Sequence, residues 1–209
     1  MRDEQPHESI HFLVSEWVAG TSGIAAARYA AQVSAKYRPR LQETELELRR
    51  RLGDAAEVLS IDGAVRSPRY TSSELYDYAY RKAVARRSGR FARNAFVLPM
   101  SKSAEWWAKS SLERHAFFYP HVDQATGCPV SGHARAAQAG STLFRRLYRN
   151  PDGYDRSGEF DFVTYFECED EHVETFESLC AALRDTRNNP EWRFVNEGPL
   201  WRGRRVQRW

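Results

Sequence analysis

The order of regular elements in the second half of this chain constrains its fold more than any other feature. The hydrophobic pattern predicts strand, helix, strand, strand, helix, strand over residues 95–100, 103–118, 142–149, 160–167, 173–183 and 192–195. The two middle strands flank the turn-forming sequence Asn150-Pro151-Asp152-Gly153, which is typical of a β-hairpin. This is the ferredoxin-like split βαβ order, an antiparallel sheet with its helices on one face. The other face of such a sheet needs cover from a second sheet or a partner subunit.

The first half has a similar but less distinct pattern. It predicts strand, helix, strand, helix over residues 11–19, 24–36, 58–65 and 72–87, with Pro39 stopping the alanine-rich first helix. We therefore expect an α+β protein with a first and a second half.

Composition excludes several functional classes. No run approaches the roughly 18 apolar residues of a membrane span, and the charged N-terminus has no apolar signal core behind it. We therefore expect a cytoplasmic protein with no membrane partner. The net charge is only +3, and the arginine clusters at 49–51 and 202–205 fit solvated faces, so no nucleic-acid partner is expected. The aromatic content of 13% is unusual, because large aromatic side chains line cores, interfaces or the pockets of flat ligands.

Candidate metal ligands are few. The three cysteines, Cys128, Cys168 and Cys180, have neither zinc-site spacing nor an even count, and a thiolate ligand at Cys128-Pro129 is a weak alternative. Among six histidines, His121 and His133 bracket a long loop at about 119–132. From the residues alone, a histidine after a glycine-containing loop is more often a surface or capping residue than a ligand.

Two adjacent arginines lie in the strand at 142–149. Because side chains alternate along a strand, Arg145 and Arg146 point to opposite faces, and at least one lies beside apolar side chains. Such a guanidinium could reach solvent, pair with Asp161 or Glu167, or act as an anion clamp.

Five motifs taken in order closely resemble the chlorite dismutase family. They are Lys102-Ser-Ala-Glu-Trp106-Trp107, Glu113-Arg114, Arg145-Arg-Leu-Tyr148, Phe160-Asp-Phe-Val-Thr-Tyr-Phe-Glu167, and Phe176-Glu-Ser-Leu with Leu183-Arg184. The resemblance covers about residues 69–206 and is greatest to the short, dimeric branch. It implies two ferredoxin-like halves that form a barrel-like antiparallel sheet with helices outside. The first, over residues 1–92, would be truncated, and the second, over residues 93–209, would bind haem b.

The resemblance also implies residue roles. His133 matches the proximal iron ligand, Glu191 the carboxylate that orients its imidazole, Arg145 the distal arginine, and Lys102 and Trp106 the haem-edge contacts. A carboxylate on the second imidazole nitrogen fixes the ring and raises its basicity, and a distal cation attracts a small oxyanion. His133 lies one residue closer to Arg145 than in the family, and the preceding loop is longer, so His121 remains an alternative ligand. A further insertion, residues 187–190, precedes Glu191.

The activity implied is decomposition of chlorite to chloride and dioxygen, with Arg145 retaining hypochlorite until recombination. The coproheme decarboxylase branch usually lacks this arginine. Alternatives are another haem-dependent oxidation, peroxidase-like or biosynthetic, and a non-catalytic module that carries or senses haem. A homodimer is expected, because an uncovered sheet face and the Trp106-Trp107 pair would together form a large apolar patch.

Overall fold

The computed structural model describes residues 9–15, 23–65, 92–140, 142–154 and 159–208. The chain forms two compact units, residues 1–62 with 201–209, and residues 63–200. The predicted helix over 72–87 lies outside the described residues. The predicted boundary at residue 92 adjoins that segment, and it stays a prediction.

The first unit is a three-stranded antiparallel sheet with short helices. Its elements are β1 (Ser9–Ser15), α1 (Gly23–Ala26), β2 (Tyr29–Ser34), α2 (Arg38–Leu52), η1 (Gly53–Ala55) and β9 (Trp201–Arg208). β1 is central and pairs with β2 and β9. On α2, ion pairs join Glu45 to Arg49 and Glu47 to Arg50 and Arg51, so this arginine cluster lies on a solvated helix face, as predicted.

The alanine-rich helix predicted over residues 24–36 was wrong. Only four residues are helical, and Tyr29–Ser34 pairs along its whole length with β1. The gain from strand pairing therefore overrides the helix propensity of alanine. Pro39 does not stop a helix but lies in the first turn of α2, where proline's missing N–H costs nothing.

The second unit contains the predicted split βαβ arrangement. Its four strands are β3 (Asn94–Lys102), β6 (Phe144–Arg149), β7 (Phe162–Cys168) and β8 (Val195–Glu197). All neighbours are antiparallel, in the order β6-β7-β3-β8. The β6–β7 hairpin is confirmed. The segment over 58–65 forms only an isolated bridge, between Ala64 and Arg149.

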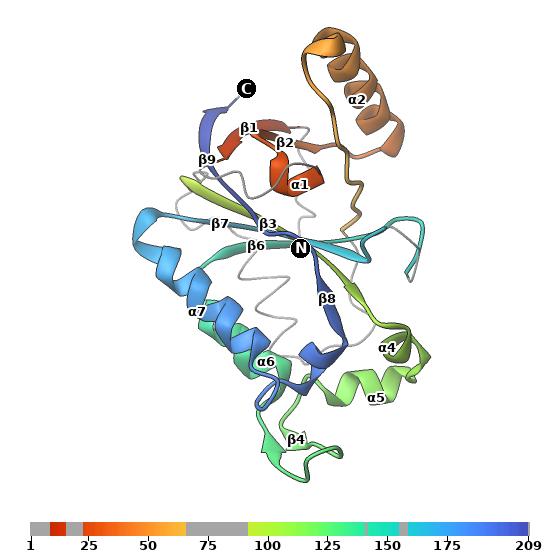
Figure 1. Ribbon diagram of the computed structural model, residues 1–209, viewed down its shortest axis with the longest axis vertical. Helices are drawn as coiled ribbons and strands as arrows, with labels where there is room; N and C mark the ends of the chain where they lie inside the picture. The colour runs from red at the N-terminus through yellow and green to blue at the C-terminus, as the bar shows by residue number, and fades with distance from the viewer. Residues whose placement is uncertain (1–8, 16–22, 66–91, 141, 155–158, 209) are drawn as a thin grey trace, which may run out of the picture. The chain divides into compact units, whose positions relative to one another are not determined.

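Helices α6 (Gly132–Ala137) and α7 (Val173–Arg184) cover one face of this sheet. The unit also contains α4 (Ala104–Ala108), α5 (Ser111–Ala116) and the 3-10 turns η3 (Gln138–Gly140), η4 (Asp170–His172) and η5 (Pro190–Phe194). α6 and α7 lie side by side below β6 and β7 in Figure 1. Phe96 of β3 stacks on Phe176 of α7 at 3.9 Å, and Phe166 of β7 joins them in the core. The α7 prediction is confirmed.

The helix predicted over 103–118 is interrupted. Lys109 is extended, and Ser110 caps a new helix by a reciprocal capping box with Glu113. Leu112 of this second helix is 79% exposed. The strand predicted over 192–195 is η5 for most of its length, and pairing begins only at Val195. No helix in the described ranges combines the length and apolarity that a membrane crossing requires.

Candidate functional site

The carboxylate of Glu191 joins two of the predicted site residues. Its Oε1 lies 2.5 Å from Nζ of Lys102, and its Oε2 lies 2.5 Å from Nδ1 of His133. Glu191 and Lys102 are both buried, and His133 is half-buried. The contact between Glu191 and His133 is close but poorly aligned, because neither Nδ1 of His133 nor Oε2 of Glu191 meets the geometry of a hydrogen bond. The carboxylate therefore faces the imidazole as a neighbouring charge.

Charge decides the protonation state of Glu191. Burial alone would raise the pKa of its carboxyl, but the neighbouring charges of His133 and Lys102 outweigh burial and hold that pKa at about 2. The pKa of Lys102 is lowered because the cost of burying its ammonium exceeds the attraction of Glu191. Glu191 is thus an ionised acceptor at neutral pH.

The residues before Glu191 form a well-bonded turn between α7 and η5. The fully buried Asn189 donates its side-chain amide to Leu183 O at 2.7 Å, and its backbone N–H donates to Asp185 O at 2.7 Å. Pro190 then begins η5. The insertion at 187–190 therefore contributes to the turn that positions Glu191 toward His133.

Gly132 places His133 at the start of α6. Its φ is +76°, and a Cβ at this position would lie 2.5 Å from Tyr119 O. Its N–H donates to Asn188 O at 3.0 Å, and the His133 N–H donates to Phe117 O at 3.0 Å. Sequence reasoning missed the role of Gly132. The available signal was a glycine directly before the candidate histidine, where backbone segments must approach closely.

The imidazole of His133 has the arrangement that a haem ligand needs. Nδ1 faces a buried carboxylate, whereas Nε2 makes no hydrogen bond or ion pair with the described residues. An orienting carboxylate on one nitrogen and a free second nitrogen are typical of metal-ligating histidines. His121 has a different environment, because its Nδ1 lies 2.8 Å from Tyr119 O and its ring packs edge-on against Phe117. Within the described ranges no group of three His, Cys, Asp or Glu residues could hold a bare ion.

Lys102 and Trp106 lie against the same cluster. The ammonium of Lys102 is 4.3 Å from the Trp106 ring centroid, and its backbone N–H donates to Asp161 at 2.7 Å. Trp106 packs with Phe118 and with Ala137 of α6. The structure thus brings together four of the five predicted residues: Lys102, Trp106, His133 and Glu191.

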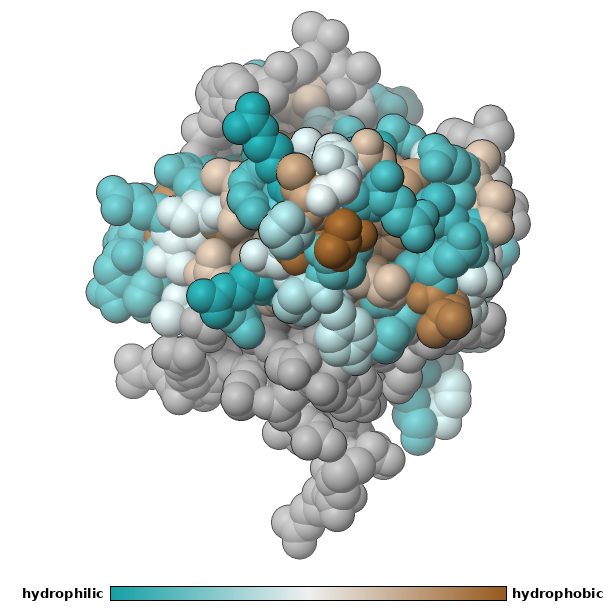
Figure 2. All heavy atoms as spheres, turned by 90° about the horizontal axis from the view of Figure 1, so that it is seen from below, coloured by the Kyte–Doolittle hydropathy of each residue, from teal (hydrophilic) through white to brown (hydrophobic). Residues whose placement is uncertain are grey.

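Trp106 does not contribute to an exposed patch. It is fully buried and Trp107 is half-buried, so the exposed tryptophan pair invoked for dimerisation was wrong. Seen from below Figure 1, the described surface is mostly polar, with hydrophobic residues in small separate patches (Figure 2). The tryptophan pair therefore gives no reason to expect a dimer.

Arg145 does not contact the other four residues but lies on their side of the sheet. Its register partner is Phe166, which packs against α7, and directly opposed residues point to the same face. Lys102 shares that face, because it is an even number of residues from Phe96 in β3. Arg146 pairs in register with Tyr165 on the opposite face, where its guanidinium is 5.6 Å from the Phe144 ring.

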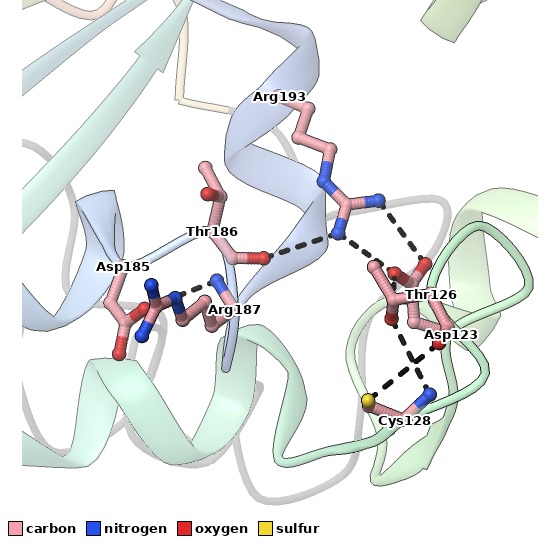
Figure 3. A network of polar contacts seen from close by, with 7 residues as sticks. All are labelled: Asp123, Thr126, Cys128, Asp185, Thr186, Arg187 and Arg193. Carbon is pink, nitrogen blue, oxygen red and sulfur yellow. Dashed lines mark hydrogen bonds and ion pairs between the residues drawn. The ribbon is translucent and has the colours of Figure 1, made fainter.

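The long loop before His133 contains a hairpin bound to η5. Its strands are β4 (His121–Val122) and β5 (Pro129–Val130). Arg193 of η5 donates two hydrogen bonds to Asp123, at 2.8 and 3.3 Å, and Thr126 donates a third at 2.8 Å (Figure 3). Cys128 is exposed in this hairpin, with its thiol 3.7 Å from Thr126 O. The hairpin is thus bonded to the 3-10 turn that carries Glu191.

Asp123→Ala should loosen this hairpin without unfolding the protein. It removes the acceptor of Arg193 and Thr126, so the amides of Asp123 and Gly127, which bond across the hairpin, should exchange with deuterium about tenfold faster or more. Thr126→Val, which removes the hydroxyl but leaves both Arg193–Asp123 bonds in place, is the control and should change exchange less. Equal exchange in wild type and Asp123→Ala would contradict this role of the ion pair.

The ion pair has a defined pH dependence. The bonds from Arg193, opposed by burial and aided by Thr126, lower the pKa of Asp123 to about 2. A lowered folded-state pKa means that the pair stabilises fully above the ordinary aspartate value of about 4, and that this stabilisation is lost as pH falls toward 2.

Comparisons with known proteins identify the fold. No protein-family model matches the sequence, and no curated protein matches it significantly. The dimeric chlorite dismutase of Nitrobacter winogradskyi is 25% identical, with 95% of each chain covered and a TM-score of 0.53. Two structures of mutant chlorite dismutase from Candidatus Nitrospira defluvii have 24% and 21% identity and TM-scores of 0.69 and 0.66. Each covers 96% of this chain and 75% of the other.

Proposed function

We propose that this chain, which belongs by its fold to the chlorite dismutase-like family, is a haem b enzyme that decomposes chlorite to chloride and dioxygen. The proposal assigns His133 as the iron ligand, Glu191 as the carboxylate that orients it, and Arg145 as the distal anion-binding residue. Lys102 and Trp106 are assigned to the haem edge. Bound haem would supply the iron at which oxygen atoms are exchanged.

The buried carboxylate on His133 is the observation that carries the proposal. Burying an ionised carboxylate is costly unless nearby charges or hydrogen bonds compensate it, and here Lys102 and His133 do so. A histidine that only packs in a core does not need a buried, ionised acceptor on one nitrogen. A metal-ligating histidine benefits from a carboxylate beside its second nitrogen, because this group orients the ring and strengthens the nitrogen that binds the metal.

The protein's own groups have separate tasks in this reaction. Glu191 lies against His133 and orients it, and Lys102 contributes to keeping Glu191 ionised inside the protein. Arg145 attracts the chlorite anion and then retains the hypochlorite that leaves, so that it can recombine. The reaction balances without an added reductant, since both oxygen atoms of chlorite leave as dioxygen and its chlorine becomes chloride.

An absorption spectrum and an oxygen electrode test the proposal. The purified protein, loaded with haem, should show a Soret band and release dioxygen rapidly from chlorite. Haem uptake with turnover of peroxide or an organic substrate, but not of chlorite, would favour a different haem-dependent oxidase. Haem uptake with no turnover would favour a haem carrier or sensor. Failure to bind haem would exclude all three.

We also propose a homodimer, because the Nitrobacter winogradskyi protein that covers the same length is described as dimeric. The tryptophan pair does not support this, as shown above. Light scattering at micromolar concentration should give twice the mass of the chain. The mass of a single chain would contradict the proposal.

A further inference from the structure

Arg149 is a buried cation without a counter-ion among the described residues. It is 6% exposed, and its Nη1 donates to the Tyr154 hydroxyl at 3.0 Å. Its Nε is buried and has no hydrogen-bond partner. No carboxylate of the described part of the chain lies within ion-pair distance of its guanidinium. Lys102, the other buried cation there, is in contrast paired with Glu191.

Arg149 lies on the same face of the sheet as Arg145. The two are four residues apart in β6, so they share a face, with their Cα atoms roughly 13 Å apart. Arg149 pairs in register with Phe162, which pairs in turn with Met100, two residues before Lys102. Arg149 and Lys102 therefore lie at the same end of the sheet.

Aromatic rings connect Arg149 to this site. Tyr154, its hydrogen-bond partner, stacks on Trp107 with ring centroids 4.3 Å apart, and Phe162 lies 5.5 Å from Tyr154. Trp107 follows Trp106 in α4, and its indole N–H donates to Asp161, which also accepts from the backbone of Lys102. The hydrogen bond to Tyr154 thus connects the guanidinium to the packed rings of Tyr154, Trp107 and Phe162, and Trp107 is next to Trp106 of the proposed haem edge.

A buried guanidinium of this kind needs an anion. Burial of an unpaired ion is strongly unfavourable, and arginine's planar donors match the two oxygens of a carboxylate. The Tyr154 hydroxyl accepts from one of these donors and orients the guanidinium, but it is not a carboxylate counter-ion. Haem carries two propionate carboxylates, which are anions of this kind.

We propose that Arg149 binds a propionate carboxylate of the haem. This inference rests on the proposed haem binding and adds an anchor to it. Arg149 then selects porphyrins that carry a free acid at this edge, whereas Arg145 acts on the small anion.

Titration of the apoprotein with haem and with haem dimethyl ester tests this anchor. Wild type should bind haem more tightly than the ester, by about tenfold or more, the effect of one hydrogen bond to a charged group. Arg149→Gln should lose this preference by weakening haem binding while leaving the ester's affinity unchanged. Arg149→Lys should restore part of it. Arg146→Gln, on the opposite face of the same strand, is the matched control and should keep the wild-type preference.

The outcomes separate two failures. If wild type binds neither porphyrin, the proposed function fails together with the anchor. If wild type binds both equally, or if Arg149→Gln weakens both to the same extent, haem binding stands but Arg149 has only a structural role. Circular dichroism of each variant shows whether it is folded, and the lysine variant keeps the test decisive if the glutamine variant is not.

Discussion

His133→Ala is expected to lose stable haem binding. The variant removes the only proposed protein ligand to the iron, and packing against the porphyrin faces then has to retain the group alone. It also removes the imidazole that lies against Oε2 of Glu191, so Lys102 is the remaining close partner of this buried carboxylate. Haem titration should show affinity reduced by orders of magnitude, or a spectrum without the signature of histidine ligation.

His121→Ala is the matched control, because it removes the alternative ligand from the neighbouring hairpin. Its contacts are a backbone carbonyl and the Phe117 ring, and neither involves Glu191. Haem content and spectrum should therefore match wild type. If His121→Ala loses haem and His133→Ala keeps it, the ligand assignment is wrong. Added imidazole should partly restore the spectrum of His133→Ala, which distinguishes a lost ligand from a misfolded protein.

Much of the second unit was predictable from sequence, because hydrophobic periodicity and turn chemistry agree there. The Asn150-Pro151-Asp152-Gly153 turn and the two runs around it gave the hairpin, and the spacing of Phe176, Leu179 and Leu183 gave α7. The alanine-rich segment of the first unit was not predictable in this way. Alanine marks neither face of a strand nor of a helix, so strand pairing with β1 decided its structure.

The site was predictable in its residues but not in its contacts. The motifs point to Lys102, His133 and Glu191 separately, but a linear pattern does not state that one carboxylate lies between a lysine and a histidine. That depends on the turn around Asn189 and on the close approach allowed by Gly132. Arg149 was not predicted either, because its significance lies in burial without a counter-ion among the described residues, which a linear pattern does not show.

Arg145→Ala is expected to keep its haem and lose most of its chlorite turnover. Arg145 contacts neither His133 nor Glu191, so its removal should leave the proximal side intact. Removing one charged donor that acts on developing charge typically costs on the order of a hundredfold in rate. Stopped-flow measurement of dioxygen release should show this loss. Hypochlorite should also escape more often, so the variant should bleach after fewer turnovers, and a hypochlorite trap in solution should collect more product.

Arg146→Ala isolates the position of the charge from the number of charges. Both variants remove one arginine from β6, so the net charge and the long-range attraction of anions change equally. They differ in the face of the sheet, because Arg145 pairs in register with Phe166, which packs against α7, and Arg146 pairs with Tyr165 on the other side. Arg146→Ala should therefore retain near wild-type turnover. Equal activity in the two variants would contradict the proposed role of Arg145. A large loss in Arg146→Ala alone would assign the distal cation to Arg146, and the face of β6 that carries Arg146 would then be the one toward the haem site.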